Sequence, residues 1–578
     1  MSLLTWRWQV APTLPAAADR ALIPLGPPIL RQILFNRGYA DIHQAQAFLE
    51  GHSLSSTDPM ELMGMREAVD RLWRALEAGE KIVVYGDYDT DGVTATALLV
   101  EALRALGGNV EPYIPSRFVE GYGLTVEALQ VLQEKHGAGV VVTVDCGIRS
   151  PNEAAFARRI GLDLIITDHH HPGPELPQAL AAINPKQPGD GYGYKDLAGV
   201  GLAYKLAQAL YDRARETGRP ADFPVERLLD LVALGTVADL ALLTGENRSM
   251  VRKGLELLNR AEREGVKGLI LTSRAKAGGI GAGTIGYSLG PRLNAAGRLD
   301  SALAAFELLT TQDPGEASRL AVKLETQNRE RQDLTLSIYK TARELVTSSR
   351  KDAYLLFAFD PGFNPGVVGL AASRLVDEFY RPALVATLAP DEGGGVIRGS
   401  ARSIGEFDIT RALDECADLL EHHGGHKAAA GFTVKRENLR AFQERLEAIA
   451  RSQLEGLDLR PCLVIDSEVR ISSLDWALVE HLEALEPCGI GNPAPVLAVR
   501  NTKVIAFRSV GRDGGHLKLT LSDGHIAIDA IAFRLGAWAK KMPQRLDVAF
   551  NLEVNEWNGQ KNLQLNVRDL KEPGRPDA

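Results

Sequence analysis

Short apolar runs alternate with helix-like segments in the first third of the chain. Residues 81–85, 140–144 and 164–166 are largely apolar, which is typical of strands buried on both faces of a sheet. Residues 93–106 follow a helical pattern that ends at Gly107 and Gly108. This alternation predicts a parallel α/β sheet, in which ligands bind where the strands end.

The pattern changes twice in the remaining sequence. Residues 317–346 predict one long connecting helix, and residues 352–453 predict a second α/β region. From residue 462 to 570 the pattern indicates short alternating strands, such as 527–533, and turns, such as 512–515. This last part predicts a small β-barrel, for which an oligonucleotide-binding (OB) fold is a candidate.

Composition narrows the class of protein. A chain of 578 residues is too long for one core and fits three or four domains, taking ~100–200 residues for each. Its 45% hydrophobic and 24% charged residues are close to the average for soluble globular proteins. The net charge of -9 argues against a basic coat for nonspecific nucleic-acid binding, but a local basic groove stays possible.

The cysteines and the first residues indicate the compartment. The four cysteines lie far apart without a CxxC pair, so neither a disulfide framework nor a zinc knuckle is expected. Charges and prolines interrupt residues 1–30, where a signal peptide or a membrane helix needs an apolar stretch. We therefore expect a cytoplasmic protein that does not associate with membranes.

Three aspartates directly follow the first predicted strand, in the run Gly-Asp87-Tyr-Asp89-Thr-Asp91-Gly. A calcium-binding EF-hand loop begins in the same way, but its twelfth position is here Leu98 instead of glutamate, and a strand precedes it. Taken alone, the run is equally compatible with a surface turn.

The next strands also end in possible metal ligands. Asp145 follows the second strand, and Asp168, His169 and His170 follow the third. Crowded carboxylates repel each other and their pKa values rise unless a cation holds them, so this pattern favours a divalent metal site. Asp239 ends an apolar helical run, although a solvated aspartate at a helix end would look the same.

These four elements, in this order, resemble the DHH phosphoesterase superfamily. The resemblance implies two metal ions, Mn²⁺ or Mg²⁺, held by Asp89, Asp91, Asp145, His169 and Asp239, with Asp145 bridging the two. It also implies that Asp87 and Asp168 support the site and that His170 faces the scissile phosphate and counts among the catalytic residues.

The second α/β region carries a glycine-rich motif. Gly424-Gly425-His426 before Ala428–Gly431 resembles the signature of the DHH-associated domain, in which backbone N–H groups and a histidine approach phosphate. The same residues are also compatible with the start of a helix.

Several features together resemble the RecJ family of bacterial single-strand exonucleases: the length, the long helix, the C-terminal β-domain and the segments 291–298 and 399–403. The resemblance implies that arginines and a serine hold the 5′ phosphate. The candidates for phosphate or DNA binding are Arg117, Arg298, Ser400, Arg402, Gly425 and His426.

The chain departs from that family at two points. Phe363-Asn364 stands where a Trp-His pair is usual; the phenylalanine ring is suited either to base stacking or to core packing, and Asn364 cannot ionise. The segment Gly399-Ser400-Ala401-Arg402 lacks a second glycine that is common there.

The expected fold is therefore two α/β domains, DHH and DHH-associated, joined by a long helix, plus a C-terminal OB-like β-barrel. The expected segments are an N-terminal helical segment (1–50), the DHH domain (51–312), the connecting helix (313–350), the DHH-associated domain (351–456) and the OB-like domain (457–578).

The expected function is a 5′-to-3′ exonuclease that degrades single-stranded DNA by two-metal hydrolysis in DNA repair and recombination. We expect a monomer that binds single-stranded DNA with a 5′ end and works with a helicase and a single-strand-binding protein. Two alternatives stay open: a DHH enzyme acting on small substrates such as short oligonucleotides, and a catalytically silent DNA-binding scaffold. A nucleotide-cofactor enzyme is disfavoured because no GxGxxG turn follows the first strand.

Overall fold

The computed structural model describes residues 5–574 apart from residues 56, 117–119, 122, 350–352 and 390–394. The chain divides into two compact units. The larger unit comprises residues 10–325 and 464–576, and the smaller unit comprises residues 1–9 and 326–463. Each unit is described separately below.

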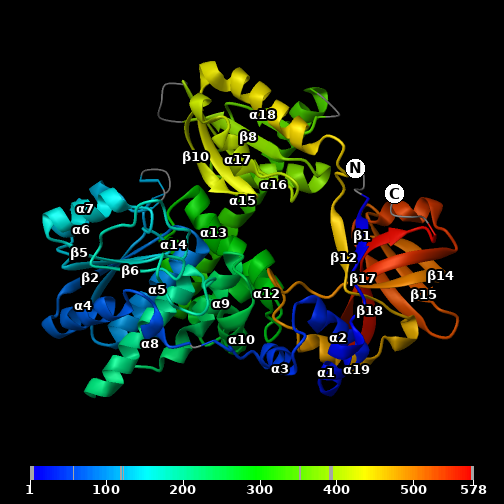
Figure 1. The fold of residues 1–578 in the computed structure, drawn as a ribbon, viewed down its shortest axis with the longest axis horizontal. Helices are drawn as coiled ribbons and strands as arrows, with labels where there is room; N and C mark the ends of the chain where they lie inside the picture. The colour runs from blue at the N-terminus through cyan, green and yellow to red at the C-terminus, as the bar shows by residue number, and fades with distance from the viewer. Residues whose placement is uncertain are drawn as a thin grey trace. The chain divides into compact units, whose positions relative to one another are not determined.

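A five-stranded parallel sheet forms the centre of the first α/β domain, which is part of the larger unit (Figure 1). Its strand order is β3-β2-β4-β5-β6, with β2 Lys81–Gly86, β3 Asn109–Tyr113, β4 Val140–Val144, β5 Asp163–Thr167 and β6 Ala181–Ile183. The parallel α/β sheet expected from the apolar runs is confirmed. The strands β3 and β6 had not been expected.

Helices cover both faces of this sheet. One face packs against α4 Met65–Ala78, α5 Thr90–Ala105, α8 Gly199–Thr217 and α9 Leu229–Ala238, and the other against α6 Val126–Glu134 and α7 Pro151–Ile160. The helix expected at 93–106 begins three residues earlier, because Asp89 caps the N-terminus of α5. The carboxyl ends of the strands consequently meet the N-terminus of α5 at one edge.

A helical layer extends this first domain. It consists of α10 Gly245–Arg260, α11 Glu264–Ser273, α12 Ala282–Thr284, the π-helix η4 Ile285–Leu289, α13 Gly290–Leu299 and α14 Leu303–Thr310. The long helix expected at 317–346 is present as α15, Pro314–Ser349, and it runs from the larger unit into the smaller one.

The N-terminal segment is joined to the rest of the larger unit by a buried arginine. After β1 (Arg7–Val10), the segment contains α1 Ala16–Leu22, α2 Pro28–Asn36 and α3 Ile42–Glu50. Arg248 of α10 is 1% exposed, and its guanidinium donates hydrogen bonds to the carbonyl oxygens of Phe48 and of residues 484–487. Burial lowers the pKa of Arg248 to about 10, and the five carbonyl oxygens replace the water it loses.

The C-terminal part of the larger unit is a closed β-barrel. Its order is β14-β15-β16-β18-β17, closed by pairing of β14 with β17; the strands are β14 Leu497–Val510, β15 His516–Ser522, β16 Ala527–Ala532, β17 Arg545–Trp557 and β18 Gln560–Lys571. Three strands are longer than the pattern suggests. In β14 the reason is visible, since residues 497–503 pair with β17 and residues 503–510 pair with β15.

The smaller unit is built on a mixed sheet of order β10-β11-β9-β8-β7. Its strands are β7 Leu356–Phe359, β8 Ala383–Leu388, β9 Val396–Arg402, β10 Leu420–His426 and β11 Ala429–Lys435, and its helices are α16 Val368–Phe379, α17 Ile409–Asp414 and α18 Leu439–Leu454. The second α/β region that the sequence predicts is therefore present.

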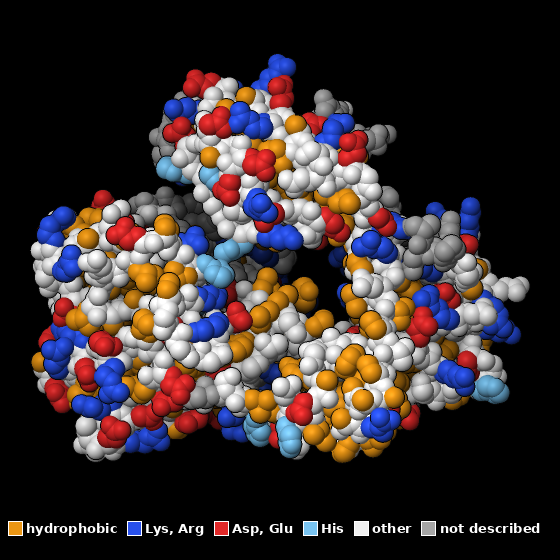
Figure 2. All heavy atoms as spheres, in the orientation of Figure 1, with side chains coloured by type: hydrophobic (Ala, Val, Ile, Leu, Met, Phe, Trp, Pro, Cys, Tyr) orange, Lys and Arg blue, Asp and Glu red, His pale blue; other side chains and the backbone are white. Residues whose placement is uncertain are grey.

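Two surface properties bear on the class of protein. On the face drawn in Figure 2, basic and acidic side chains are interspersed, in line with a net charge that excludes a basic coat. Among the described residues, no helix combines the length and the apolar character needed to cross a bilayer.

Candidate metal centre

The first two aspartate carboxylates of the site are fixed by helix N-termini. Asp89 caps α5, and its Oδ1 accepts hydrogen bonds from the N–H groups of Asp91 (2.9 Å) and Gly92 (3.1 Å). Asp91 accepts hydrogen bonds from the N–H groups of Gly199 (2.7 Å) and Val200 (2.8 Å) at the start of α8. Because helix N-termini carry partial positive charge, both contacts favour the ionised carboxylate.

Glycines let two helices approach these carboxylates closely. A Cβ atom at Gly199 would lie 2.7 Å from Oδ1 of Asp145, and one at Gly235 of α9 would lie 2.8 Å from Oδ1 of Asp91. Any side chain at either position would displace the helix from the site. The helices α8 and α9 thus form a close wall behind the carboxylates.

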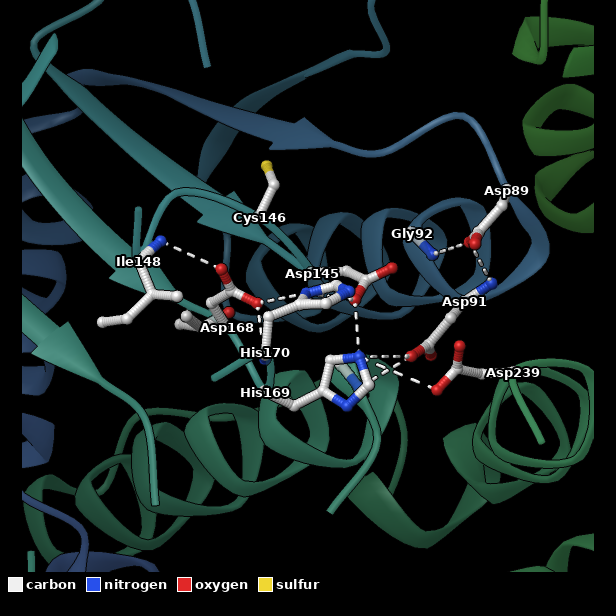
Figure 3. Close-up of polar contacts among 12 residues, drawn as sticks. Asp89, Asp91, Gly92, Asp145, Cys146, Ile148, Asp168, His169, His170 and Asp239 are labelled. Carbon is white, nitrogen blue, oxygen red and sulfur yellow. Dashed lines mark hydrogen bonds and ion pairs between the residues drawn. The ribbon is translucent and has the colours of Figure 1, made fainter. Parts of the chain in front are cut away.

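Asp145, at the end of β4, lies at the centre of the cluster. Nε2 of His169 is 3.1 Å from Oδ1 of Asp145, 3.7 Å from Oδ2 of Asp239 and 3.9 Å from Oδ2 of Asp91 (Figure 3). Asp145 itself has a left-handed backbone, with φ of 63°. The structure brings together residues that are up to 148 positions apart in the sequence, from Asp91 to Asp239.

Three sets of side chains place their ligand atoms within 4.8 Å of one another. These sets are Asp91, His169 and Asp239; Asp87, Asp89 and Asp145; and Asp145, His169 and His170. Asp145 belongs to two of them. Asp87 had been assigned a supporting role, but its position also makes it a candidate ligand.

Burial and mutual repulsion disfavour the ionised carboxylates. Burial, followed by the charge of Asp89, raises the pKa of Asp91 to about 7. Burial and the charges of Asp91 and Asp89 raise the pKa of Asp239 to about 9, and the same causes raise the pKa of Asp145 well above its usual range. The cluster is therefore a site of excess negative charge, which the nearby His170 and Lys186 offset only in part.

The two histidines of the motif differ in charge. Burial lowers the pKa of His169 to about 3, so its ring is neutral, as a metal ligand must be. Burial also acts to lower the pKa of His170, but the hydrogen bond with Asp168 and the charge of that carboxylate outweigh it, and the pKa rises. His170 is thus the proton carrier of the pair.

Asp168 is already engaged by protein groups. Its Oδ1 lies 2.8 Å from Nδ1 of His170 and accepts a hydrogen bond from the N–H of that residue, while its Oδ2 accepts one from the N–H of Ile148 (2.9 Å). These contacts favour the supporting role expected for Asp168. Figure 3 shows its carboxylate between Ile148 and the His170 ring.

The donor set fits divalent metal ions. Oδ1 of Asp145 and Nε2 of His169 are buried and face each other at 3.1 Å, but neither atom forms a hydrogen bond to a described residue, and buried polar atoms without one are costly. Carboxylate oxygens with one or two imidazoles suit Mn²⁺ and Mg²⁺, whose charge would reverse the repulsion.

Three positioning residues had not been predicted from the sequence. Nζ of Lys186 donates to the carbonyl oxygen of His169 (2.7 Å), and Nδ2 of Asn184 donates to that of His170 (2.9 Å). Oδ1 of Asn294 accepts from the N–H of Thr90 (2.9 Å). Asn184 and Lys186 follow β6, so the rule that functional residues follow strand ends would have found them had this three-residue strand been recognised.

Family models and related proteins identify this arrangement. The DHH family N-terminal domain matches residues 81–236, the DHHA1 domain matches residues 352–452, and the RecJ OB domain matches residues 465–569. The single-stranded-DNA-specific exonuclease RecJ of Bacillus subtilis is 40% identical over 94% of this chain and 68% of its own length. RecJ of Escherichia coli is 33% identical over 94% of this chain and 96% of its own length.

The chain belongs to the RecJ family. A crystal structure of RecJ from Thermus thermophilus in complex with Mn²⁺ superposes with a TM-score of 0.84 at 31% identity, covering 98% of this chain and 80% of that one. The resemblance to the DHH superfamily and to RecJ, inferred from motifs, is confirmed, as are the two α/β domains and the OB-like barrel.

The RecJ motif at 291–298 forms most of α13 and packs on the aspartate loop. A Cβ atom at Gly297 would lie 2.4 Å from the carbonyl oxygen of Tyr88, so α13 touches the loop between Asp87 and Asp89. Arg298 is the next residue of this helix and is half-buried. This candidate for phosphate binding therefore belongs to the larger unit, together with the metal ligands.

The other described phosphate candidates gather on one sheet of the smaller unit. Arg402 of β9 is paired with Ala429 of β11, which is paired in turn with His426 of β10. Ser400 lies two residues from Arg402 and therefore on the same face. A Cβ atom at Gly369, in the first turn of α16, would lie 2.9 Å from Nη2 of Arg402 and 3.3 Å from Oγ of Ser400. The helix N-terminus, a guanidinium and a hydroxyl thus lie close together, an arrangement suited to phosphate.

The glycine-rich motif forms a strand, and the helix start that its sequence also permits does not occur. Gly425 has φ of 152° in β10, and a Cβ atom there would lie 2.3 Å from the carbonyl oxygen of Ala429. Pairing with β11 therefore requires glycine at this position.

Two remaining positions behave differently. The Phe363 ring is 6% exposed and packs in the core with α16, so core packing is correct and base stacking is not. Oδ1 of Asn364 accepts a hydrogen bond from the N–H of Gly366 (2.8 Å), which shapes the turn before α16. Arg117, a candidate for phosphate binding, lies outside the described residues.

Proposed function

We propose that this chain is an exonuclease that degrades single-stranded DNA from its 5′ end by metal-dependent hydrolysis, in DNA repair and recombination. The observation that carries the proposal is the buried cluster of carboxylates and His169 at the carboxyl edge of the β2–β5 sheet in a chain of the RecJ family. The clustered carboxylates destabilise the folded protein unless cations bind them. Their presence is therefore better explained by a function in metal binding than by a contribution to stability.

Two bound divalent metals would activate a water molecule and neutralise charge on the phosphate and on the leaving oxygen. For these ions we propose Asp89, Asp91, Asp145, His169 and Asp239 as ligands, with Asp145 bridging and Asp87 as a further candidate. Asp89 and Asp91 are held in place for this task by hydrogen bonds that their carboxylates accept from backbone N–H groups of α5 and α8, respectively.

His170 would act on the phosphate. Asp168 engages Nδ1 of His170 and raises the pKa of its ring, which favours the protonated form. Nε2, on the opposite side of the ring, would then donate a hydrogen bond or a proton to a phosphate oxygen. Lys186 and Asn184 fix the backbone of the two histidines and thereby the direction of both rings.

The 5′ preference would come from an end pocket for the leading phosphate. For this pocket we propose Ser400, Arg402, Gly425 and His426 of the smaller unit. Separately, we propose Arg298 and Arg117 as phosphate- or DNA-binding residues of the chain. A terminal phosphate carries one more negative charge than an internal phosphodiester, and guanidinium groups near a helix N-terminus favour that extra charge.

End-labelled oligonucleotides test this proposal. With Mn²⁺ or Mg²⁺, we expect single nucleotides to be released first from the 5′ end, no reaction in EDTA, and loss of activity in Asp145→Ala. The matched control is Asp212→Ala, which removes an exposed aspartate from the same domain. Release from the 3′ end first, or full activity of Asp145→Ala, would overturn the proposal.

Substrate length separates this function from that of a DHH enzyme for small substrates. We expect long oligonucleotides to be much better substrates than dinucleotides, because the matched RecJ OB domain adds a surface for nucleic acid. A preference for dinucleotides would favour the other function, and DNA binding without any metal dependence would favour a scaffold.

We further propose that the chain works as a cytoplasmic monomer together with a helicase and a single-strand-binding protein. A nuclease specific for single strands needs another protein to open a duplex, which is the basis for the helicase. Sedimentation of the purified chain, and degradation of duplex DNA with and without a helicase, would test both parts.

A further inference from the structure

Leu240, the residue after Asp239, has a backbone conformation that leucine seldom adopts. Its φ is 61°, in the left-handed region. The N–H of Leu240 donates to the carbonyl oxygen of Val237 (3.3 Å), and the N–H of Ala241 donates to that of Thr236 (3.2 Å). These two bonds form a Schellman ending of α9, in which the left-handed position is usually glycine.

Burial of the Leu240 side chain does little to offset the strain in its backbone. It is 66% exposed, so most of its apolar surface stays in water. An exposed leucine alone is ordinary, and a left-handed residue alone is occasional. Their combination at one position means that glycine would serve the fold better, and backbone strain of this kind concentrates at functional sites.

Leu240 directly follows a residue through which the metal centre reaches solvent. The Asp239 side chain is 25% exposed and that of His170 is 32% exposed, whereas those of Asp91 and Asp145 are 0% and 3% exposed. The cluster is therefore accessible at Asp239, next to the exposed Leu240.

The turn that contains Leu240 packs closely against the segment where the π-helix passes into α13. A Cβ atom at Gly290, where the π-helix passes into α13, would lie 3.2 Å from Cβ of Ala238. This close packing fixes the turn after α9 against the segment that begins the RecJ motif, so Leu240 projects from a rigid support.

We propose that Leu240 packs against the base of the nucleotide whose phosphate is cleaved, and that this contact positions the phosphate at the metal centre. The inference rests on the proposed function, because it requires single-stranded DNA as the substrate. Every base has an apolar face, so a leucine contact suits a nuclease that does not read sequence. Leu240 is thus a positioning residue that selects polymers with bases over simple phosphodiesters.

Leu240→Gly is the decisive variant, because it removes the side chain and relieves the backbone strain together. We expect Leu240→Gly to unfold at the same temperature as wild type or a higher one. We also expect its affinity for single-stranded DNA, measured in EDTA by fluorescence anisotropy, to fall roughly three- to tenfold. A residue with only a structural role would not raise stability and lower affinity together.

Three further variants sharpen this result. Leu240→Asn, which also tolerates the left-handed conformation, should lose affinity like Leu240→Gly, while Leu240→Met should keep the apolar contact and the wild-type affinity. Ala261→Gly is the matched control, since Ala261 also has a left-handed φ, of 49°, at the C-cap of α10. It should leave the affinity unchanged.

A single abasic nucleotide, placed at successive positions from the 5′ end, tests the contact with a base. At one position the losses from the abasic site and from Leu240→Gly should not add, because both remove the same contact. Additive losses at every position, or unchanged affinity of Leu240→Gly, would overturn the inference. If wild-type protein degrades no single-stranded DNA at all, the proposed function fails instead.

Discussion

Two clusters of buried charge lie in the same α/β domain, and they differ in whether side chains of the protein neutralise the charges. Arg263 is buried between Glu101 and Asp230, at 2.6 Å and 2.9 Å, and also donates to the carbonyl oxygen of Leu309. Burial acts to lower the pKa of Arg263, but the two carboxylates outweigh it and raise the pKa. In the metal centre the carboxylates of Asp91, Asp145 and Asp239 form no ion pair with a described arginine or lysine side chain. The charge of Lys186 offsets only part of the repulsion at Asp239, and the pKa values of all three carboxylates are raised.

The difference shows how a structural cluster is distinguished from a functional one. The Arg263 cluster is complete within the chain, so its removal should cost stability. The metal centre is incomplete without cations, so its alteration should cost activity while stability is kept or gained. The predictions below test this contrast.

The largest effect is expected for Asp145→Asn, the substitution that changes the metal centre least in shape. Loss of the bridging carboxylate should lower nuclease activity at least about 10³-fold, which corresponds to ~4 kcal/mol of transition-state stabilisation. In EDTA, the variant should unfold at no lower temperature than wild type, because the asparagine side chain resembles the protonated carboxyl that the raised pKa of Asp145 favours. Initial rates on a 5′-labelled oligonucleotide and thermal unfolding measure the two quantities.

If Asp145→Asn were markedly less stable than wild type in EDTA, the carboxylate would be part of the structural framework, and the contrast between the clusters would be lost. Asp212→Asn, at an exposed position, is the control and should change neither quantity.

The next largest effect is expected for Arg263→Leu. Removing one partner from a buried ion cluster typically destabilises a protein by about 3–5 kcal/mol, because the remaining charges stay buried without a partner. Chemical denaturation would measure the change. Adding Glu101→Gln and Asp230→Asn to the variant should recover part of the loss, since the unpaired charges are then removed.

Arg215→Leu provides the comparison for Arg263→Leu. Arg215 also pairs with an aspartate, Asp212, but its side chain is 79% exposed, so water can replace the partner. Equal destabilisation by both variants would mean that burial does not set the cost.

Metal binding should stabilise only one of the two clusters. With Mn²⁺ at about 100 times its dissociation constant, wild-type protein should gain ~2.7 kcal/mol per independent site. The gain should be reversed by EDTA and reduced in Asp145→Asn, while Arg263→Leu should keep it. An equal gain in wild type and Asp145→Asn would place the metal elsewhere.

The smallest effect concerns pH in the absence of metal. The folded-state pKa values of Asp91, about 7, and Asp239, about 9, lie above the ordinary value for aspartate, so the folded protein holds protons that the unfolded chain releases. The contribution of these two groups to stability is therefore highest below about pH 4. It falls as pH rises to 7 and then to 9, by at most about 1.4 kcal/mol per pH unit for each group.

The difference in unfolding temperature between wild type and Asp239→Asn isolates one of these groups. In EDTA the variant should gain on wild type as pH rises from 5 to 8, and Mn²⁺ should abolish the trend. A difference that does not vary with pH would show that Asp239 is not held protonated by its neighbours.

The sequence was informative where a local pattern decides the structure. The strands β2, β4 and β5 are apolar runs followed by acidic residues, and both features can be read from neighbouring positions. The sequence does not predict β3, because Pro112 and the polar residues Asn109 and Glu111 argue against a strand. It does not predict β6, because that strand has only three residues.

Long-range packing accounts for the remaining differences. Pairing with β11 makes Gly425 part of a strand, and the core of the smaller unit takes up Phe363. Leu240 gave no signal, because the left-handed end of a helix is read from glycine and this helix ends without one. For the site, the sequence shows the spacing of the candidate ligands. It does not show that the N-terminus of α8, at residues 199 and 200, holds Asp91, because these residues lie far apart in the chain.

The buried Arg248 has a consequence for how domains of this family can be exchanged or removed. Its five carbonyl acceptors come from Phe48 and from residues 484–487, which precede the barrel. Deleting the barrel together with residues 464–496 would remove four of the five acceptors, and water would have to replace them at the guanidinium, so the shortened protein should be less stable. A barrel transplanted from a relative would have to bring the loop at 484–487 and a compatible N-terminal segment. Recombination between members of this family should therefore keep the barrel, this loop and the N-terminal segment together.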